Sequence, residues 1–145
     1  QEVNQHFDIQ LEAARILSKK YSNIKVAVLT APNFSKEFMQ EKLENFRLPY
    51  MLLRDEPFRM IHLVDLMLVA SGTAALEVGL MKKPMVIMYR MKWLTGIFAK
   101  LFVRGSKYFG LVNLILNKEA VPEQFQEEVT PEKIAALLDR YISDK

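Results

Sequence analysis

The sequence predicts an α/β fold with a doubly wound parallel sheet, and two observations lead to this prediction. Apolar runs of strand length alternate with amphipathic stretches of helical period, with short connections between them. The clearest example is segment 66–90, LMLVASGTAALEVGLMKKPMVIMYR, where two apolar runs flank a turn of small residues and a helical stretch. This order is typical of a βαβ unit with a right-handed crossover.

The elements before this unit follow from hydrophobic period and capping signals. Apolar residues at helical spacing predict helices, and uninterrupted apolar runs predict buried strands. Ser, Asn, Asp or Glu before a helical stretch, and Pro in its first turn, mark where helices begin. In chain order we expect a helix over 7–17, a strand over 24–30, a helix over 36–45 capped by Asn33 or Ser35, a strand over 50–53, and a helix from Asp55 or Glu56 to about 63.

The remaining elements lie within the βαβ unit and after it. Inside the unit, strands over 66–70 and 85–89 flank a helix over 75–81 that Pro84 ends. Further along we expect a strand or extended segment over 111–116, a helix beginning at Val121-Pro122-Glu123 with Gln126 on the same face as Glu123, and a last, structural helix that begins at Thr130-Pro131-Glu132.

Composition narrows the class of protein. A chain of 145 residues that is 50% hydrophobic and 26% charged suits a single globular domain. No apolar run is long enough to span a membrane, and the chain has no Cys. His6 and His62 are far apart in the sequence and have no carboxylate at ligand spacing, so we predict no metal site. The net charge of +3 favours anionic partners, which include nucleotides, nucleic acids and acidic lipids.

The turn Ser71-Gly72-Thr73-Ala74 is the candidate binding site. A turn that leaves a parallel strand brings the unpaired N–H groups of the next helix to the carboxyl edge of the sheet, where the helix dipole favours an anion such as phosphate. Glu77 lies one turn further on the same helix face, where its carboxylate can accept two hydrogen bonds from the diol of a ribose. The alternative is that these small residues only allow close packing at a strand–helix corner.

Two longer segments resemble one known family. SGTAALE followed by PMVIMYRMK, and then NLILNKEAVPEQFQ over 113–126, resemble in the right order the carboxyl-terminal half of lipid-A-disaccharide synthase. The resemblance implies a glycosyltransferase of the GT-B type, built from two Rossmann-like halves, which joins UDP-diacylglucosamine to lipid X and releases UDP. Residues 1–145 would then be a single nucleotide-sugar-binding domain, the donor-binding half. The family's loop that binds phosphate would fall just before Gln1, and Glu2 stands for a family glutamate.

The same resemblance implies roles for individual residues. It places the UDP pyrophosphate against Ser71, Gly72, Thr73 and Ala74, the ribose on Glu77, a counter-charge to phosphate on Arg90, and Asn113 and Gln126 in the lining of the donor site. Val112 departs from the family, which has Pro before that Asn. No cofactor or metal is implied, and the catalytic base is expected on an amino-terminal acceptor domain that is absent here. The chain alone is therefore expected to bind but not to turn over.

Residues 91–109 have a different character. Apolar side chains recur at helical spacing among Lys and Arg, with no Asp or Glu, which is typical of a helix lying on an anionic lipid surface. A helix packed on the sheet is an equally weighted alternative. The first interpretation predicts a cytoplasmic protein peripherally associated with the inner membrane, with these membrane contacts: Trp93, Leu94, Ile97, Phe98, Lys100, Leu101, Phe102, Arg104 and Lys107.

Two other functions fit the same sequence features. Another GT-B enzyme that uses UDP-sugars, such as a peptidoglycan glycosyltransferase or a nucleotide-sugar epimerase, would also place small residues and a Glu at this turn. A non-catalytic module of the membrane surface with a vestigial nucleotide site would explain the basic aromatic stretch. We expect no nucleic-acid partner for any of the three. Saturable binding of UDP would separate the enzymes from the module.

Overall fold

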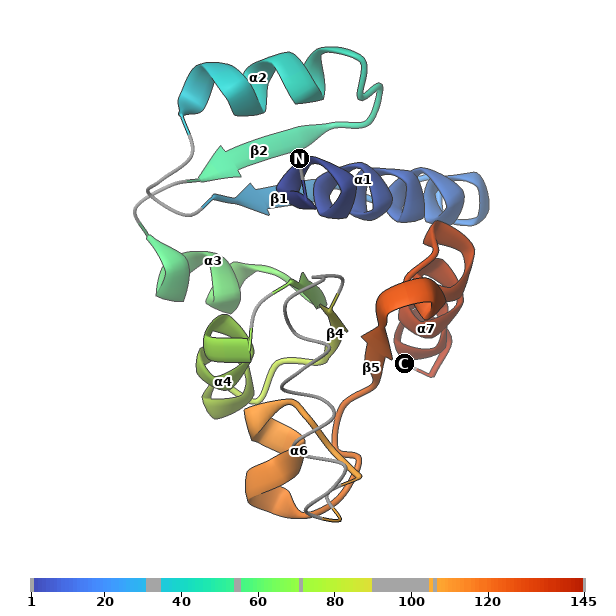
Figure 1. Ribbon diagram of the computed structural model, residues 1–145. Helices are drawn as coiled ribbons and strands as arrows, with labels where there is room; N and C mark the ends of the chain where they lie inside the picture. Colours follow the sequence, from blue (N-terminus) through green and yellow to red (C-terminus); the bar gives the residue numbers. More distant parts are fainter. Residues whose placement is uncertain are drawn as a thin grey trace.

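The computed structural model describes residues 2–30, 35–53, 56–70, 72–89, 105 and 107–144. Helices and strands alternate along most of this part of the chain (Figure 1). The elements are α1 (Glu2–Lys20), β1 (Val26–Leu29), α2 (Lys36–Glu44), β2 (Tyr50–Leu53), α3 (Pro57–Leu63), β3 (Met67–Val69), α4 (Gly72–Leu80), β4 (Met85–Tyr89), α6 (Leu111–Leu116), β5 (Glu123–Phe125), the 3-10 helix η1 (Gln126–Glu128) and α7 (Pro131–Ser143).

All strands of the described residues pair in parallel. β1 pairs with β2, and β3, β4 and β5 form a second sheet with β4 in the middle. The predicted α/β class with parallel strands is therefore confirmed. The pairing is in two sheets and not in one continuous sheet, since no described ladder joins β1 to β3.

β4 is covered on both faces. All five of its residues are buried, as expected for a parallel strand between two helical layers. Met85, Ile87 and Tyr89 pack in one apolar cluster with side chains of α4 and α6. Val86 and Met88 point the other way, because side chains alternate along a strand, and they pack with α1 and α7.

α1 connects the two halves of the fold. Its residue Phe7 belongs to the apolar cluster of β1, β2 and α2, whereas Ala13 and Leu17 belong to the cluster of β4 and α7. At the end of α1 the Nζ atom of Lys20 lies 2.7 Å from a carboxylate oxygen of Asp139 in α7. The helix therefore packs on both sheets, and in Figure 1 it lies between the β1–β2 pair and α7.

Two helix starts follow the capping signals in the sequence. The Ser35 hydroxyl accepts a hydrogen bond of 3.1 Å from the N–H of Phe38, so Ser35 caps α2. Asn33, the other candidate cap, lies outside the described residues. Thr130 caps α7 by accepting from the N–H of Lys133 at 3.3 Å, and Pro131 follows at the first helical position, as predicted.

The predictions for 111–126 were wrong in secondary structure. Leu111–Leu116 is the helix α6, which ends at Asn117 in the left-handed conformation, and not a strand. An apolar run of six residues does not distinguish a strand from a short helix. Glu123–Phe125 is a strand and not the start of a helix, because the N–H of Ile87 in β4 binds the carbonyl of Pro122 and pairs this segment with the sheet.

Most of the basic aromatic segment, residues 91–109, lies outside the residues that the structure describes. Residues 90–104 and 106 are not among the described residues, so the predicted helix and its contacts from Trp93 to Arg104 stay predictions. The end of the segment is described, and Lys107, Tyr108 and Phe109 are not helical. The helix therefore does not extend to Phe109. Within the described ranges, no helix has the length and apolar character needed to cross a membrane.

Ile87→Ala should lower the free energy of unfolding by about 2–5 kcal/mol. The Ile87 side chain is 0% exposed, so its truncation leaves a cavity in the core. Met51→Ala on β2 is the matched control. It removes a side chain that is 56% exposed, so the change should stay within about 0.5 kcal/mol. Urea unfolding of both variants measures the difference. Equal losses would contradict the central position of β4.

Candidate functional site

The carboxyl ends of three neighbouring strands meet at one edge of the second sheet. β3, β4 and β5 run parallel, so the residues that follow them lie along the same edge. Of the residues singled out from the sequence, Gln126 lies there, directly after β5. Ser71 and Arg90 themselves lie outside the described residues. In an open α/β sheet this edge is where ligands bind.

α4 begins earlier than predicted, at Gly72 and not at Ala75. The N–H groups of Gly72, Thr73 and Ala74 therefore belong to the first turn of a helix of nine residues, where backbone donors have no acceptor within the helix. The Thr73 side chain is exposed, and Glu77 is half-buried one turn later on the same face. This geometry suits an anion followed by a polar group such as a diol.

Asn113 has an extensive set of hydrogen bonds inside the protein. Its side-chain amide donates to the carbonyl of Val121 at 2.8 Å and to Oε1 of Glu123 at 2.6 Å. Its oxygen accepts from the N–H groups of Ala120 and Val121 at 2.8 and 3.0 Å. Two donors and two acceptor sites complete the capacity of an amide side chain. Asn113 thus fixes the connection from α6 to β5, and its predicted contact with the donor stays a prediction.

Glu123 is a residue whose role the sequence did not reveal. Its carboxylate accepts from the N–H of Phe109 at 3.1 Å and from the N–H of Gly110 at 2.9 Å, in addition to Asn113. These donors lie at the start of α6, where a negative charge is favourable. A Cβ atom on Gly110 would come within 2.6 Å of Oε1 of Glu123, so this position admits only glycine without a shift of the carboxylate.

Three aromatic rings pack beside this carboxylate. Tyr89 at the end of β4 stacks on Phe125 with centroids 5.4 Å apart, and Phe109 meets the edge of Tyr89 at 4.8 Å. Burial raises the pKa of the Tyr89 hydroxyl, and the negative charge of Glu123 raises it further. Tyr89 therefore remains neutral at physiological pH, and the cluster fixes the carboxyl ends of β4 and β5 relative to each other.

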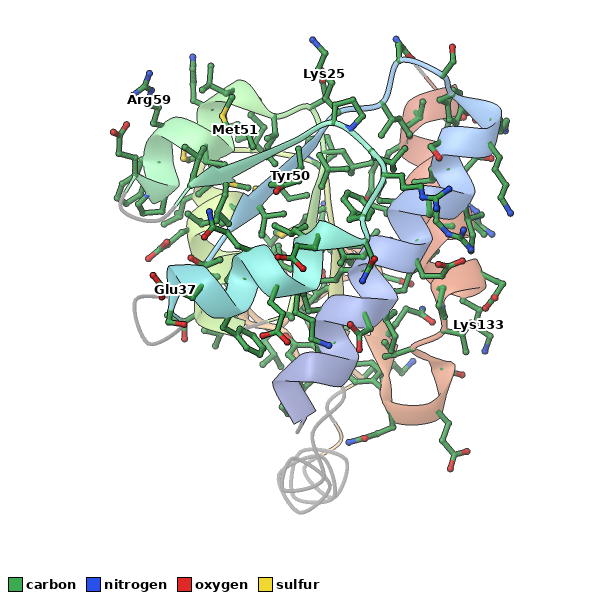
Figure 2. The ribbon with its side chains drawn as sticks, turned by 90° about the horizontal axis from the view of Figure 1, so that it is seen from above. Lys25, Glu37, Tyr50, Met51, Arg59 and Lys133 are labelled. Carbon is green, nitrogen blue, oxygen red and sulfur yellow. The ribbon has the colours of Figure 1, made fainter. Side chains whose placement is uncertain are left out.

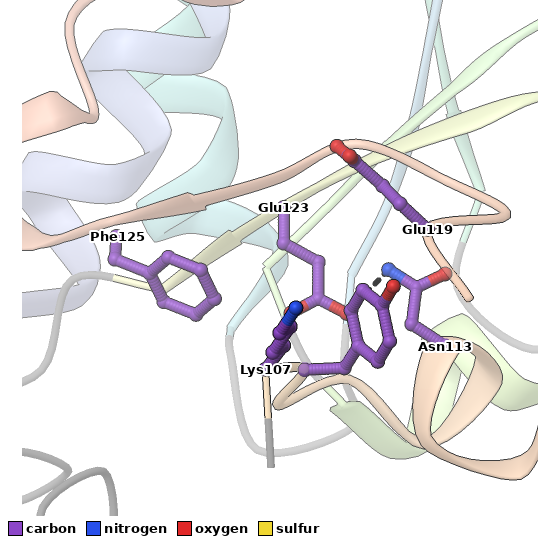
Figure 3. A pocket seen from close by; sticks show the side chains of 6 residues that line it. Lys107, Asn113, Glu119, Glu123 and Phe125 are labelled. Atoms are coloured by element: carbon purple, nitrogen blue, oxygen red, sulfur yellow. Dashed lines mark hydrogen bonds between the residues drawn. The ribbon is translucent and has the colours of Figure 1, made fainter. Parts of the chain in front are cut away.

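A small pocket opens next to the cluster (Figure 3). Its volume is about 150 Å³, below the range of about 300–1,000 Å³ that is typical of ligand pockets. This pocket is too small to enclose a whole nucleotide. It is lined by Lys107, Tyr108, Asn113, Glu119, Glu123 and Phe125. Lys107, which the sequence assigned to a membrane contact, is exposed and lies at its rim.

Gln126 follows β5 in an unusual backbone conformation. Its φ angle is +49°, in the left-handed region that non-glycine residues rarely adopt. Because Glu123–Phe125 is a strand, Gln126 does not share a helix face with Glu123, and that part of the prediction was wrong. The residue instead begins the 3-10 helix η1 at the edge where β3 and β4 also end.

No metal site is visible in the described part of the chain. No three His, Cys, Asp or Glu side chains there lie close enough together to hold a metal ion. The polar groups at the edge of the sheet are backbone N–H donors and the carboxylate of Glu77, which suit phosphate and hydroxyl groups.

Comparisons with known proteins agree on one family. The family model described as lipid-A-disaccharide synthetase matches residues 1–145. A lipid-A-disaccharide synthase of Aromatoleum aromaticum is 34% identical over 138 residues, which cover 92% of this chain and 35% of that protein. One of Geobacter metallireducens is 32% identical over 143 residues, covering 99% of this chain and 37% of that protein.

Part of the chain is more similar still to another relative. A lipid-A-disaccharide synthase of Haemophilus influenzae is 54% identical over 80 residues, 55% of this chain and 20% of that protein. The chain thus spans about a third of the length of the relatives that match nearly all of it, at 35% and 37%.

Asn113→Asp should lower the free energy of unfolding by about 2–3 kcal/mol, because a carboxylate cannot donate to Val121 or Glu123 and places a buried negative charge beside that of Glu123. Asn117→Asp, on an exposed residue of the same type, should change it by less than about 0.5 kcal/mol. Chemical unfolding followed by circular dichroism measures both. Equal stability of the two variants would show that the hydrogen bonds of Asn113 do not hold the loop.

Proposed function

The chain belongs to the lipid-A-disaccharide synthetase family, and we propose that it is the part of such a glycosyltransferase that binds the UDP group of the sugar donor, UDP-diacylglucosamine. The observation that carries this proposal is the start of α4 at the carboxyl edge of three parallel strands. Glu77 lies on the same helix one turn later. A nucleoside diphosphate needs both groups, an anion site and a partner for its ribose.

In this proposal the N–H groups of Gly72, Thr73 and Ala74 bind the pyrophosphate together with the Ser71 turn. Each is a donor in the first turn of α4, and the helix dipole adds partial positive charge. Glu77 accepts hydrogen bonds from the ribose hydroxyls. Arg90, which directly follows β4, supplies a positive charge to the phosphates.

The same groups would assist glycosyl transfer. When the bond from sugar to phosphate breaks, negative charge grows on the departing UDP. Fixed N–H dipoles and a cation then stabilise the transition state more than the bound donor. Lipid X would be the acceptor. We place its site and the general base on the amino-terminal domain, so the chain alone would bind UDP without turning over.

Gln126 and Asn113 take different parts in the proposed site. The left-handed backbone of Gln126 at the edge of the sheet costs about 1 kcal/mol or more, and such strain is often found at binding sites. Gln126 is therefore proposed to face the donor. Asn113 is buried with its amide groups bonded internally, so we propose that it supports the donor site by positioning Glu123 and β5.

The basic aromatic segment, residues 91–109, is proposed to hold the enzyme at an anionic membrane surface. This surface would be the cytoplasmic side of a bacterial inner membrane. Its apolar side chains would enter the lipid interface, and Lys100, Arg104 and Lys107 would attract acidic headgroups. The exposure of Lys107 supports this proposal. A diacylated donor also has to be withdrawn from a lipid phase.

Glu77→Gln in the full-length protein should weaken UDP binding about tenfold or more, because a neutral amide replaces a charged acceptor worth about 1.5–3 kcal/mol. Isothermal titration with UDP measures the change. Glu132→Gln on α7, which neutralises an exposed carboxylate, should leave the affinity unchanged. If Glu77→Gln folds and binds UDP like the unmodified protein, Glu77 is not in the site. If the unmodified protein shows no saturable binding, the nucleotide site is vestigial.

Replacing Leu94, Phe98 and Leu101 together by Ser should abolish binding to vesicles of anionic lipid and leave the unfolding temperature nearly unchanged. Core residues would behave otherwise, because truncating each would cost about 2–5 kcal/mol out of a total of about 5–15 kcal/mol. Vesicle sedimentation at low and high salt, combined with thermal unfolding, tests both statements. The proposal would be contradicted if the triple variant unfolds and the unmodified protein does not bind the vesicles at low salt. The segment would then be part of the core.

A further inference from the structure

His6 is one of three buried polar side chains in the described part of the chain, with Thr30 and Asn113. Asn113 is bonded within the connection from α6 to β5, and the N–H of Thr30 extends the pairing of β1 with β2. His6 is 7% exposed and lies in the second turn of α1. A buried histidine is informative, because its imidazole is polar and histidine changes charge between about pH 5 and 8.

The helical period places His6 on the face of α1 that packs on the second sheet. Ile9 and Ala13 belong to the apolar cluster of β4 and α7, and both point within about 60° of His6 around the helix axis. Leu68 in β3 and Ala70 directly after it pack on the same cluster. The His6 side chain is therefore on the side of α1 toward β3 and β4.

α1 begins at the carboxyl edge of the second sheet. α7 starts at that edge, because Pro131 follows β5 and η1 closely, and it runs back along the sheet. Its last turns meet the end of α1, where Asp139 accepts from Nζ of Lys20 at 2.7 Å and from the Tyr21 hydroxyl at 2.6 Å. The two helices thus run in the same direction, side by side in Figure 2, where Lys133 marks the start of α7. The first turns of α1 therefore lie at the edge where β3, β4 and β5 end.

A hydrogen bond between α1 and β3 fixes the position of His6 along this strand. The side-chain amide of Gln10 donates to the carbonyl of Leu68 at 3.5 Å. His6 precedes Gln10 by one turn, a rise of about 6 Å, and a strand advances about 3.3 Å per residue. His6 is thus level with Ala70, about two residues beyond Leu68, and close to the start of α4 at Gly72.

The charged groups on the elements around His6 are mostly carboxylates. The side chains that β3 and β4 direct toward α1 are apolar. Glu77 is half-buried, and Arg90, which follows β4, lies outside the described residues. The exposed charged groups on the neighbouring elements are Asp8 on the opposite side of α1, Glu127 and Glu128 on η1, and Glu132 and Lys133 at the start of α7. A positive charge at His6 would therefore add to the attraction of an anion at the start of α4.

We propose that His6 contributes a pH-dependent positive charge to the nucleotide site, and that its imidazolium attracts the pyrophosphate bound at the start of α4. This inference rests on the proposed function and adds a proton to the binding step. Neutral His6 takes up one proton when UDP binds and releases it when UDP leaves. The protonated form binds phosphate more tightly, so the affinity that His6 adds is present at low pH and is lost as the pH rises.

Calorimetric titration of the full-length protein with UDP at pH 6 and pH 8 tests the proposal. The affinity of the unmodified protein, divided by that of His6→Gln at the same pH, should be about fivefold larger at pH 6 than at pH 8. Glutamine keeps polar groups at this position but carries no charge, and the ionisation of UDP itself cancels in the ratio. A ratio that is constant from pH 6 to pH 8 would overturn the proposal.

His62→Gln on α3 is the matched control, because His62 is exposed. Its ratio should be the same at both pH values. His6→Leu is a second variant, whose apolar side chain suits the face of α1 that packs in the cluster of β4 and α7. It should fold, as judged by circular dichroism, and should lose the same pH dependence as His6→Gln.

Proton uptake by the unmodified protein gives a result that needs no variant. Titration with UDP at pH 7.5 in two buffers of different ionisation enthalpy should show that binding takes up a measurable fraction of a proton, and no uptake would overturn the proposal. The phosphates of UDP are almost fully ionised at this pH. If the unmodified protein binds no UDP at any pH, the proposed nucleotide site itself is wrong. UDP binding without the pH-dependent ratio removes His6 alone.

Discussion

The burial of β4 on both faces is the constraint on which the rest of the structure depends. Its five residues are all buried, and each large apolar side chain among them contributes about 1.5–3 kcal/mol. One face requires α4 and α6 as cover, and the other requires α1 and α7. Pairing with β3 and β5 on its two edges then fixes three carboxyl ends side by side. The edge where we place the nucleotide is therefore a product of the core.

Much of the fold was predictable because local signals and burial agree. β4 matches its predicted range of 85–89, and α2 and α7 begin beside the predicted caps Ser35 and Thr130. Agreement failed where an element depends on a distant partner. Glu123–Phe125 is a strand because it pairs with the edge of β4. Leu111–Leu116 is a helix, and its Val112 packs on Gly79 and β4. The hydrophobic pattern within the six residues of α6 or the three residues of β5 contains no information about such distant partners.

The sequence predicted which residues belong to the candidate site better than it predicted how they are arranged. Small residues after a strand predicted a turn over 71–74, but in the structure residues 72–74 already belong to α4. Asn113 and Glu123 are the opposite case. The sequence shows both residues, yet their hydrogen bond of 2.6 Å spans ten positions and exists only once α6 and β5 have formed. A buried polar network is a property of the folded chain, because its partners meet only through packing.

The Glu123 carboxylate also explains how a strand as short as β5 is held in place. Three residues give few ladder bonds, but the first of them is tied to the start of α6 through Phe109 and Gly110, and the last stacks on Tyr89. Both ends are thus fixed by contacts outside the ladder. Gln126, the next residue, is then held in a left-handed conformation that a free chain would avoid. The network around Glu123 therefore fixes the place where the chain turns at the edge of the sheet.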